Sequence, residues 1–550
     1  MNFRKATVCN RSVTALFPTQ PSLAGMLELL SGVGFGRARE LRRGRDVAWW
    51  SGARGRPPLG EKSVLLQPGS TCWRTATAGR VALLMENGAY FAALRQALEN
   101  AQRSIILLGW QFDPRTRLVA DDTGPAAEVG HILRRLVIER PELDIRLLIW
   151  ASPLPIAFSQ GFFPQRAQRW FRRKTVNFRL DRARPIGGCH HQKVVVIDDA
   201  LAFCGGGDVS VDRWDTAGHL DADPRRFTPY GLPYPPRHEV MMMMDGQAAH
   251  ALGDLARQRW RDGTGEPCEP VTAPADPWPA DVEPDLRDVT VGICRTEPAW
   301  RGAAGVRENE ALHLEAIARA KRLIYLENQY FTSPLIAAAL AARLEEADGP
   351  EVVIVSTARS PSWFDHATMD GSRSALLERL GEADIHGRFS AWTPRTRKGD
   401  TIIVHSKVSI IDDALLRVGS TNLNNRSCGF DTECDVAVET QDETGEAADF
   451  IRSFRARLVS HFLGMDQALF ESTYAVMASL GKTIEGLTDG RMVRLGVMRA
   501  TPMARWFADY QLGDPASPAD AWRPWRRRRL SRVLKETVQR AQAAEDTGSD

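Results

Sequence analysis

Two stretches of the chain repeat one pattern of histidine, lysine and aspartate, and the second stretch lies 214 positions after the first. The six repeated residues are His191, Lys193, Asp198, His405, Lys407 and Asp412. Two imidazoles and two ammonium groups around one point suit the cleavage of a phosphodiester. One imidazole attacks phosphorus, the other protonates the departing alkoxide, and the lysines hold the anionic oxygens. This chemistry demands no metal and no cofactor, and we expect neither.

The two aspartates end the apolar run that follows each lysine. We group Asp198 and Asp412 with the catalytic motif, and we expect them to brace the local backbone or the opposite loop rather than to touch substrate. A single His-x-Lys is common and usually marks a solvated turn. Two copies at equal spacing, each followed by a turn of small residues, are hard to obtain by chance.

The small-residue turn after each motif is a candidate phosphate-binding site. It contains Gly206 and Asp208 in the first copy, and Ser420 and Asn422 in the second. Small residues let the backbone approach a phosphate closely, so we expect these four positions to bind substrate. A carboxylate beside an anionic phosphate is unfavourable unless it is turned away, protonated or bridged by a lysine. The two halves of the site therefore differ at Asp208.

The repeat extends upstream of both motifs, which predicts duplicated α/β domains. Apolar residues at helical spacing in 91–101 and 311–318 each lead into an apolar run, 103–112 and 322–331. Further strand candidates are 145–150 and 352–356. Strands that alternate with helices predict two α/β domains, each a mixed sheet flanked by helices.

Composition shifts divide the chain into five segments. We expect an unassigned N-terminal extension (1–66), a first half (67–264), a Pro-rich linker (265–288), a second half (289–470) and a C-terminal region (471–550). The last contains two tryptophans beside arginines at 522–529, a predicted basic helix and an acidic tail. A Pro-rich loop at 221–236 interrupts only the first half, either as a lid on the substrate side or as plain surface.

Charge and hydropathy limit the partners. A net charge of +3 over 550 residues is nearly neutral, so the whole molecule is not an obvious polyanion binder. No signal peptide or continuous apolar run of about 18 residues is recognised, which predicts a cytoplasmic or peripheral membrane protein. The internal duplication completes the site within one chain, so we expect a monomer.

The doubled His-x-Lys-x4-Asp motif followed by Gly-Gly or Gly-Ser resembles the signature of the phospholipase D superfamily, over residues 67–470 or so. Three details resemble the phospholipase D enzymes proper, including the eukaryotic-type ones, more than the short nuclease members. These are residues 205–208 continuing to 213–215, the strand at 324–331, and residues 419–427 followed by 431–433.

The resemblance implies two α/β domains related by a pseudo-twofold axis, with one active site at their interface and a phosphatidyl-histidine intermediate. It implies that His191 is the nucleophile and His405 the general acid. It also implies a carboxylate from each half behind the histidine of the other, holding its tautomer. Glu433 and Glu239 occupy the matching positions.

The function implied by the resemblance is hydrolysis of glycerophospholipids such as phosphatidylcholine to phosphatidic acid and free headgroup, with transphosphatidylation as a side or main activity. The expected partner is a phospholipid at a membrane surface. One alternative is a phosphatidyltransferase of the cardiolipin synthase type, although the chain shows no amino-terminal membrane span. Another is a nuclease, but neither motif is flanked by the basic groove with stacking aromatics that nucleic acid requires. A lipid-binding protein with a vestigial site is disfavoured because both copies retain their histidine and lysine.

Overall fold

The computed structural model describes residues 64–121, 124–154, 156–157, 163–172, 176–272, 274–442, 444–496, 510–511 and 513–520. Nearly all of the predicted N-terminal extension and the basic segment at 522–529 lie outside the described residues. Among the helices of the described part, none is long and apolar enough to cross a membrane.

Strands and helices alternate in the first half. Its strands are β1 (Arg74–Met85), β2 (Ser104–Gly109), β3 (Asp144–Trp150), β4 (Asn177–Asp181), β5 (Val194–Ile197), β6 (Leu201–Gly205), β7 (Arg237–His238) and β8 (Val240–Asp245). Its helices are α3 (Glu86–Asn100), α4 (Val129–Glu139), α6 (Pro164–Phe171) and α7 (Gly246–Thr264).

The second half repeats this alternation. Its strands are β9 (Leu286–Glu297), β10 (Val306–Arg307), β11 (Leu323–Glu327), β12 (Glu351–Val355), β13 (Phe389–Pro394), β14 (Ile403–Val404), β15 (Val408–Ile411), β16 (Leu415–Gly419), β17 (Glu433–Glu439) and β18 (Met492–Arg494). Its helices are α8 (Glu308–Arg319), α9 (Pro334–Glu345), α10 (Trp363–Asp365), α11 (Gly371–Ala383), α12 (Asn425–Gly429), α13 (Glu446–Leu463), α14 (Gln467–Met477) and α15 (Leu480–Leu487).

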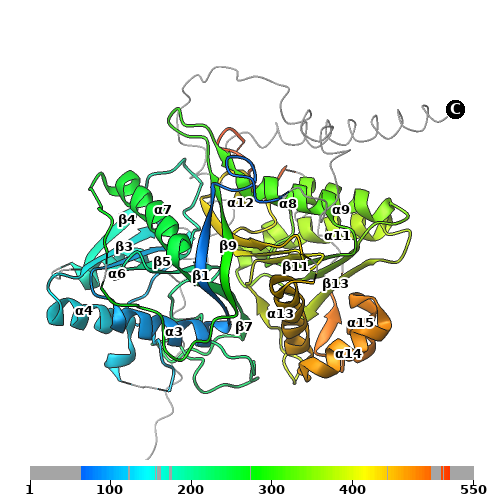
Figure 1. Ribbon diagram of the computed structural model, residues 1–550, viewed down its shortest axis with the longest axis horizontal. Helices are drawn as coiled ribbons and strands as arrows, with labels where there is room; N and C mark the ends of the chain where they lie inside the picture. The colour runs from blue at the N-terminus through cyan, green and yellow to red at the C-terminus, as the bar shows by residue number, and fades with distance from the viewer. Residues whose placement is uncertain are drawn as a thin grey trace, which may run out of the picture. The chain divides into compact units, whose positions relative to one another are not determined.

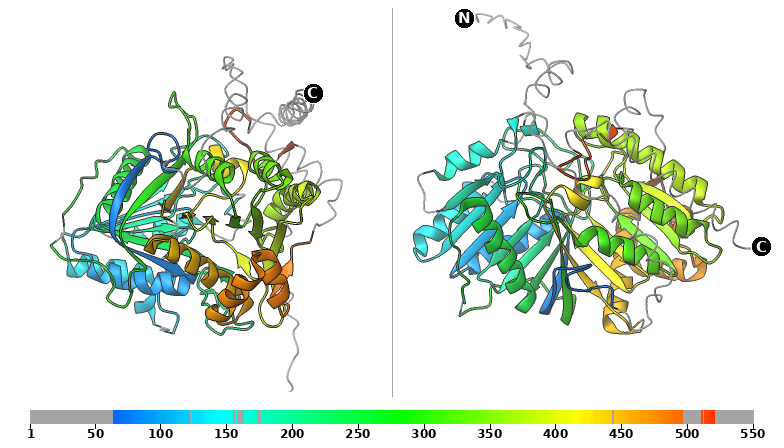
Figure 2. Two further views of the ribbon diagram at one scale, coloured as in Figure 1. Left: turned by 45° about the vertical axis from the view of Figure 1, so that its right-hand side comes forward. Right: turned by 90° about the horizontal axis from the view of Figure 1, so that it is seen from above.

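One mixed sheet runs through both halves, in the order β18-β13-β12-β11-β15-β16-β17-β9-β1-β8-β6-β5-β2-β3-β4. The order reads the same outward in both directions from the β1–β9 junction, except for β18. The long strands β1 and β9 lie side by side there and pair antiparallel (Figure 1). The predicted duplicated α/β fold is confirmed, and the two halves share a single sheet (Figure 2).

Two predicted boundaries differ from the structure. Residues 265–285 connect α7 to β9, so the last three residues of the predicted linker begin a strand. The second half also continues past residue 470, because α14 and α15 lead into β18, which pairs antiparallel with β13. Apolar spacing alone did not show this extension, since three residues of β18 are too few to carry a strand pattern.

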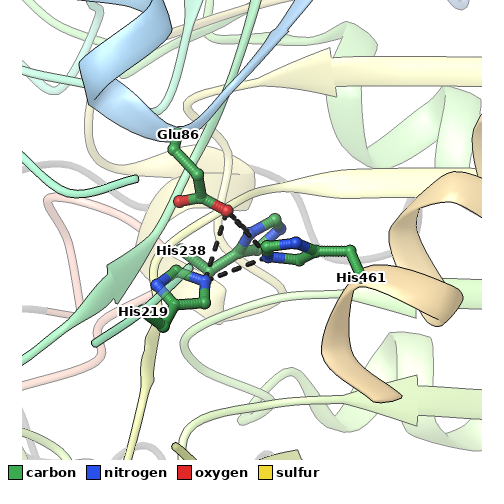
Figure 3. A group of neighbouring side chains, drawn as sticks. All are labelled: Glu86, His219, His238 and His461. Carbon is green, nitrogen blue, oxygen red and sulfur yellow. Dashed lines mark hydrogen bonds and ion pairs between the residues drawn. The ribbon is translucent and has the colours of Figure 1, made fainter. Parts of the chain in front are cut away.

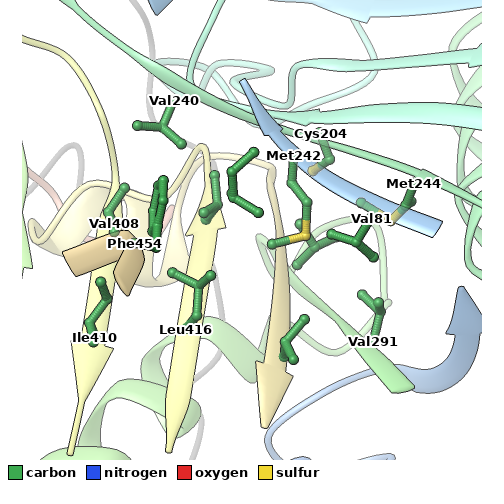
Figure 4. Close-up of a cluster of buried hydrophobic side chains, with 14 of the residues drawn as sticks. Val81, Cys204, Val240, Met242, Met244, Val291, Val408, Ile410, Leu416 and Phe454 are labelled. Atoms are coloured by element: carbon green, nitrogen blue, oxygen red, sulfur yellow. The ribbon is translucent and has the colours of Figure 1, made fainter. Parts of the chain in front are cut away.

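The core has two layers, one on each face of the sheet. The four methionines of β8 show the division, because successive side chains of a strand point to opposite faces. Met241 and Met243 pack with residues of α3 and α4, whereas Met242 and Met244 pack with residues of α7. The layer that contains Met242 and Met244 continues without a break into the other half, where it includes Phe454 of α13 (Figure 4). Continuous packing across the junction holds the two motifs in a defined relation.

Candidate active site

The two motifs come together where the halves meet at one edge of the sheet. Lys193 immediately precedes β5 and Lys407 immediately precedes β15. The backbone of each half holds the histidine of the other: His191 N donates to Thr432 O at 2.9 Å, and His405 N donates to His238 O at 2.9 Å. Main-chain hydrogen bonds between the halves therefore fix the backbone of both histidines.

Each histidine is paired with a glutamate from the opposite half. His191 Nδ1 lies 2.9 Å from Glu433 Oε2, and His405 Nδ1 lies 2.5 Å from Glu239 Oε2. Both carboxylates are fully buried, whereas 14% of the His191 side chain and 9% of the His405 side chain remain exposed. Since Nδ1 of each ring is held by a carboxylate, Nε2 is the nitrogen available to a substrate.

Burial controls the protonation of both pairs. Desolvation, with Lys193 and Lys407, lowers the pKa of His191 well below its usual range. Desolvation also raises the pKa of Glu433 well above its usual range, against the opposing charge of Lys193. The pKa of His405 is lowered by burial and by Lys407 in the same way. These shifts oppose an imidazolium in the free site, so an arriving phosphate anion is needed to favour one.

The two motif lysines occupy different surroundings. Lys193 Nζ donates to His191 O at 2.7 Å and lies 3.4 Å from Asp208 Oδ2. Asp208 Oδ1 accepts from the backbone N–H of Trp110 at 2.9 Å. The Asp208 carboxylate is therefore bridged by a lysine, one of the three arrangements that make it compatible with a phosphate. The second copy has the neutral Asn422 at this position, and Asn422 Oδ1 has no hydrogen-bond partner among the described residues.

Two of the four positions that we expect to bind substrate, Ser420 and Gly206, contact the glutamates behind the histidines. Ser420 Oγ donates to Glu433 Oε2 at 2.5 Å and accepts from Cys434 N at 3.0 Å, so its hydroxyl holds the glutamate behind His191. A Cβ on Gly206 would collide with Glu239 Oε1, so glycine leaves room for the glutamate behind His405. Both positions support the histidine pairs, and the expected phosphate contact stays a prediction.

The two motif aspartates lie at the far end of β5 and β15, away from the histidines. Asp198 accepts from the backbone N–H of Gln102, Arg103 and Ser104 at 2.7–2.8 Å. Asp412 makes the equivalent contacts with Lys321, Arg322 and Leu323 at 2.5–2.8 Å. The expectation that the two aspartates brace the backbone agrees with this placement, and grouping them with the catalytic residues is corrected by it. Each one ties the end of its own strand to the start of the antiparallel neighbour, β2 or β11, through charge-assisted bonds.

Further side chains near the histidines were not selected from the sequence. Trp110 lies edge-on to His191 with ring centroids 6.1 Å apart, and it stacks on Trp150 at 5.7 Å. Arg213 and Arg237 both depress the pKa of His405 by their charge. Trp110 immediately follows β2, beside the start of β5, and that topological position was the available signal. Arg213 and Arg237 stand in a loop and at a two-residue strand, so no periodicity marked them.

The Pro-rich loop at 221–236 is held on this edge of the sheet. Arg226 donates to Asp215 Oδ1 at 2.9 Å, and Thr396 of the second half bonds to Asp221. The loop therefore runs between the two halves beside the site.

The geometry can be compared with known proteins. A family profile described as "Cardiolipin synthase, PLD-like domain" matches residues 313–457. Phospholipase D A of Dictyostelium discoideum is 24% identical over 463 residues, which cover 70% of this chain and 36% of that protein. Phospholipase D alpha 4 of Arabidopsis thaliana is 23% identical over 486 residues, 66% of this chain and 62% of that protein. The chain belongs to the phospholipase D superfamily. The family prediction is thereby confirmed.

Other similar proteins carry other names. Cardiolipin synthase A of Pseudomonas putida is 26% identical over 364 residues, which cover 63% of this chain and 62% of that protein. A crystal structure of phosphatidylserine synthase from Haemophilus influenzae Rd KW20 matches with a TM-score of 0.49 at 12% identity, covering 74% of this chain and 95% of that one. This superfamily member spans less than two thirds of the length of each of these three curated relatives.

Proposed function

We propose that this protein is a phospholipase D-type phosphodiesterase that cleaves glycerophospholipids such as phosphatidylcholine. His191 Nε2 forms a bond to phosphorus while the bond from phosphorus to the headgroup oxygen breaks, and His405 gives its proton to that oxygen. Water or an alcohol then attacks phosphorus and gives its proton to His405, and the phosphorus–nitrogen bond breaks. The products are the free headgroup and phosphatidic acid, or a new phosphatidyl ester.

The observation that carries this proposal is the crossed pair of histidine–glutamate contacts with a lysine beside each histidine. A single pair would serve general acid–base chemistry on many substrates. Two pairs with opposite tasks, and Lys193 and Lys407 to stabilise charge on the equatorial oxygens, suit a two-step displacement at phosphorus. All of these side chains come from one chain, which supports a monomeric enzyme.

Exposed apolar side chains on the loops around the site support a lipid substrate. The segments that follow β3, β4, β6 and β12 begin at the end of the sheet where the two motifs lie. They carry the exposed side chains of Leu154, Ile186, Leu220, Phe227, Tyr230, Leu232 and Trp363. Apolar and aromatic side chains around an active site favour contact with the surface of a bilayer.

Product analysis tests the proposal directly. We expect vesicles of phosphatidylcholine in buffer with ethanol to yield free choline and phosphatidylethanol, because the covalent intermediate can be taken by an alcohol. Lys193→Met, which removes one phosphate-binding charge, should reduce both products together. Choline without phosphatidylethanol would contradict the transferable intermediate. The absence of product from phosphatidylcholine, phosphatidylethanolamine and phosphatidylglycerol would overturn the lipid substrate.

A phosphatidyltransferase of the cardiolipin synthase type is a second candidate, favoured by Arg237. This side chain is 6% exposed, and its Nε has no hydrogen-bond partner among the described residues. Burial, with the charge of Arg213, lowers the pKa of Arg237 to about 10. A buried cation whose charge acts on His405 suits a second phosphate, which a lipid acceptor such as phosphatidylglycerol supplies. Vesicles of phosphatidylglycerol alone distinguish the two functions by the main product, which is cardiolipin with glycerol for the transferase and phosphatidic acid with glycerol for the hydrolase.

The pH dependence is expected to follow Lys407. Burial, partly opposed by Glu239 and reinforced by Lys193, lowers the pKa of Lys407 to about 7. If the protonated amine stabilises the phosphate, kcat/KM falls as pH rises through about 7. The sign for stability is opposite: the unfolded chain keeps this proton up to a pKa of about 10.4, so between these values the contribution of Lys407 to stability rises with pH.

Asn422→Asp tests this assignment, because it gives Lys407 the carboxylate that Asp208 gives Lys193. The falling limb of kcat/KM should move to higher pH by about one unit. Asn100→Asp, at the exposed end of α3, is the matched control and should leave the limb in place. A limb that stays near pH 7 in Asn422→Asp would assign it to another group.

A further inference from the structure

Three histidines and one glutamate converge at a buried point behind the active site. They are Glu86 at the start of α3, His219 in the loop after β6, His238 in β7 and His461 in the last turn of α13 (Figure 3). One potential ligand atom from each of the four lies within 4.8 Å of all the others. Three of these side chains come from the first half and His461 comes from the second.

The three imidazoles face a single oxygen. Glu86 Oε1 lies 2.6 Å from His238 Nδ1, 3.1 Å from His461 Nε2 and 3.4 Å from His219 Nε2. The Nε2 atoms of His219 and His461 are also only 3.0 Å apart. Over that distance the two nitrogens either share one N–H or bind a common metal ion with both lone pairs.

Carboxylates outside the cluster fix two of the rings. His219 Nδ1 lies 2.8 Å from Asp215 Oδ2, and His238 Nε2 lies 3.0 Å from Glu327 Oε2. Each of these rings therefore donates its outer N–H to a buried carboxylate, so its inner nitrogen can bind a metal ion once it has released its proton. A carboxylate behind a metal-binding histidine is the usual way in which proteins orient such a ligand.

The backbone holds Glu86 in place as well. Glu86 adopts a φ of +67°, a conformation that non-glycine residues rarely take. Its N–H donates to Glu239 O at 2.8 Å, and its Oε2 accepts from Glu239 N at 3.1 Å. Glu86 therefore presents only Oε1 to the three imidazoles, as a monodentate ligand would.

We propose that Glu86, His219, His238 and His461 bind one divalent transition-metal ion of the zinc class. Three nitrogens and one oxygen are a donor set that suits tetrahedral zinc. Bonds of about 2.0–2.2 Å would place neighbouring ligand atoms about 3.3–3.6 Å apart. Glu86 Oε1 lies 3.1 Å from His461 Nε2 and 3.4 Å from His219 Nε2, while His238 Nδ1 is closer to it, at 2.6 Å. The four ligands complete the coordination, so the ion joins α13 of the second half to the first half and takes no part in the reaction at phosphorus.

Metal content measures this proposal independently of any activity. The full chain, produced with zinc and purified without a chelator or histidine tag, should contain about one equivalent of metal by inductively coupled plasma mass spectrometry. His461→Gln should reduce this at least about tenfold. His250→Gln, an exposed histidine on α7, is the matched control and should keep the full equivalent. Metal retained in His461→Gln would place it elsewhere and overturn the proposal.

Two further measurements test the proposal even if His461→Gln fails to fold. Cobalt replacing zinc in the wild-type protein should give visible d–d absorption of the intensity typical of four-coordinate nitrogen and oxygen ligands. Asp215→Asn, which keeps every ligand, should weaken metal binding about 10–100-fold. Wild-type protein that holds less than about a tenth of an equivalent, and shows no cobalt spectrum, would show that protons alone occupy the cluster.

Discussion

His191→Asn is expected to abolish hydrolysis and alcohol exchange together, by at least about 10⁴-fold, because no covalent intermediate can form without the nucleophile. His405→Asn should behave differently with a phosphatidyl ester of p-nitrophenol, whose leaving group departs without protonation. The first step should then proceed, and the second should stall because no base activates water. The expected result is a burst of one p-nitrophenol per enzyme followed by slow turnover.

Rapid-quench kinetics and intact-protein mass measure both variants. His405→Asn should accumulate a phosphatidyl adduct, which peptide mapping should place on His191. His191→Asn should show neither burst nor adduct. His386→Asn, an exposed histidine before β13, should match the wild type. A burst in His191→Asn and none in His405→Asn would reverse the two assignments, and a burst in neither would argue against histidine as the nucleophile.

Glu433→Gln is expected to lower kcat about 10³-fold with little change in KM. As His191 Nε2 bonds to phosphorus its ring becomes cationic, and the buried carboxylate 2.9 Å from Nδ1 stabilises that charge. Glutamine has the same size, but it carries no charge and offers the ring either an oxygen or an NH₂ group. The effect should appear in kcat because the charge develops only after substrate has bound.

Ser420→Gly is the graded comparison for Glu433→Gln. It gives the second copy the glycine of the first, Gly206, and removes the hydroxyl that donates to Glu433. The lost bond to a charged group should reduce kcat about tenfold. Thermal unfolding of both variants checks that the fold survives. If Glu433→Gln stays within about threefold of the wild type, the carboxylate does not position the nucleophile.

The local parts of the site could be read from the sequence because they are contiguous. The spacing within each motif, the strand after each lysine and the small-residue turn depend on neighbours in the chain. The pairing of β1 with β9 was not predicted, because neither strand was among the elements expected from the sequence. What the pattern could not show is which atoms meet across the junction, since periodicity records the face of a strand and not its partner.

Ser420 and Gly206 illustrate that limit. Both look like phosphate-binding turn residues by type, and the structure shows each of them against the glutamate behind a histidine. The bridge from Lys193 to Asp208 was one of three arrangements left open by the sequence, and the structure selects it. No local sequence pattern marks the cluster around Glu86, because its four residues are spread from position 86 to position 461.

The sequence by itself determined the chemistry: a doubled histidine and lysine motif, an α/β duplication and membership of a superfamily. The tertiary structure decided how the two copies meet: the contacts of His191 with Glu433 and of His405 with Glu239, which the resemblance implied, span 242 and 166 positions. Those contacts exist because β1 and β9 join the two halves into one sheet and a shared core packs across the junction. Residue types set what the groups can do, and long-range packing sets which of them meet.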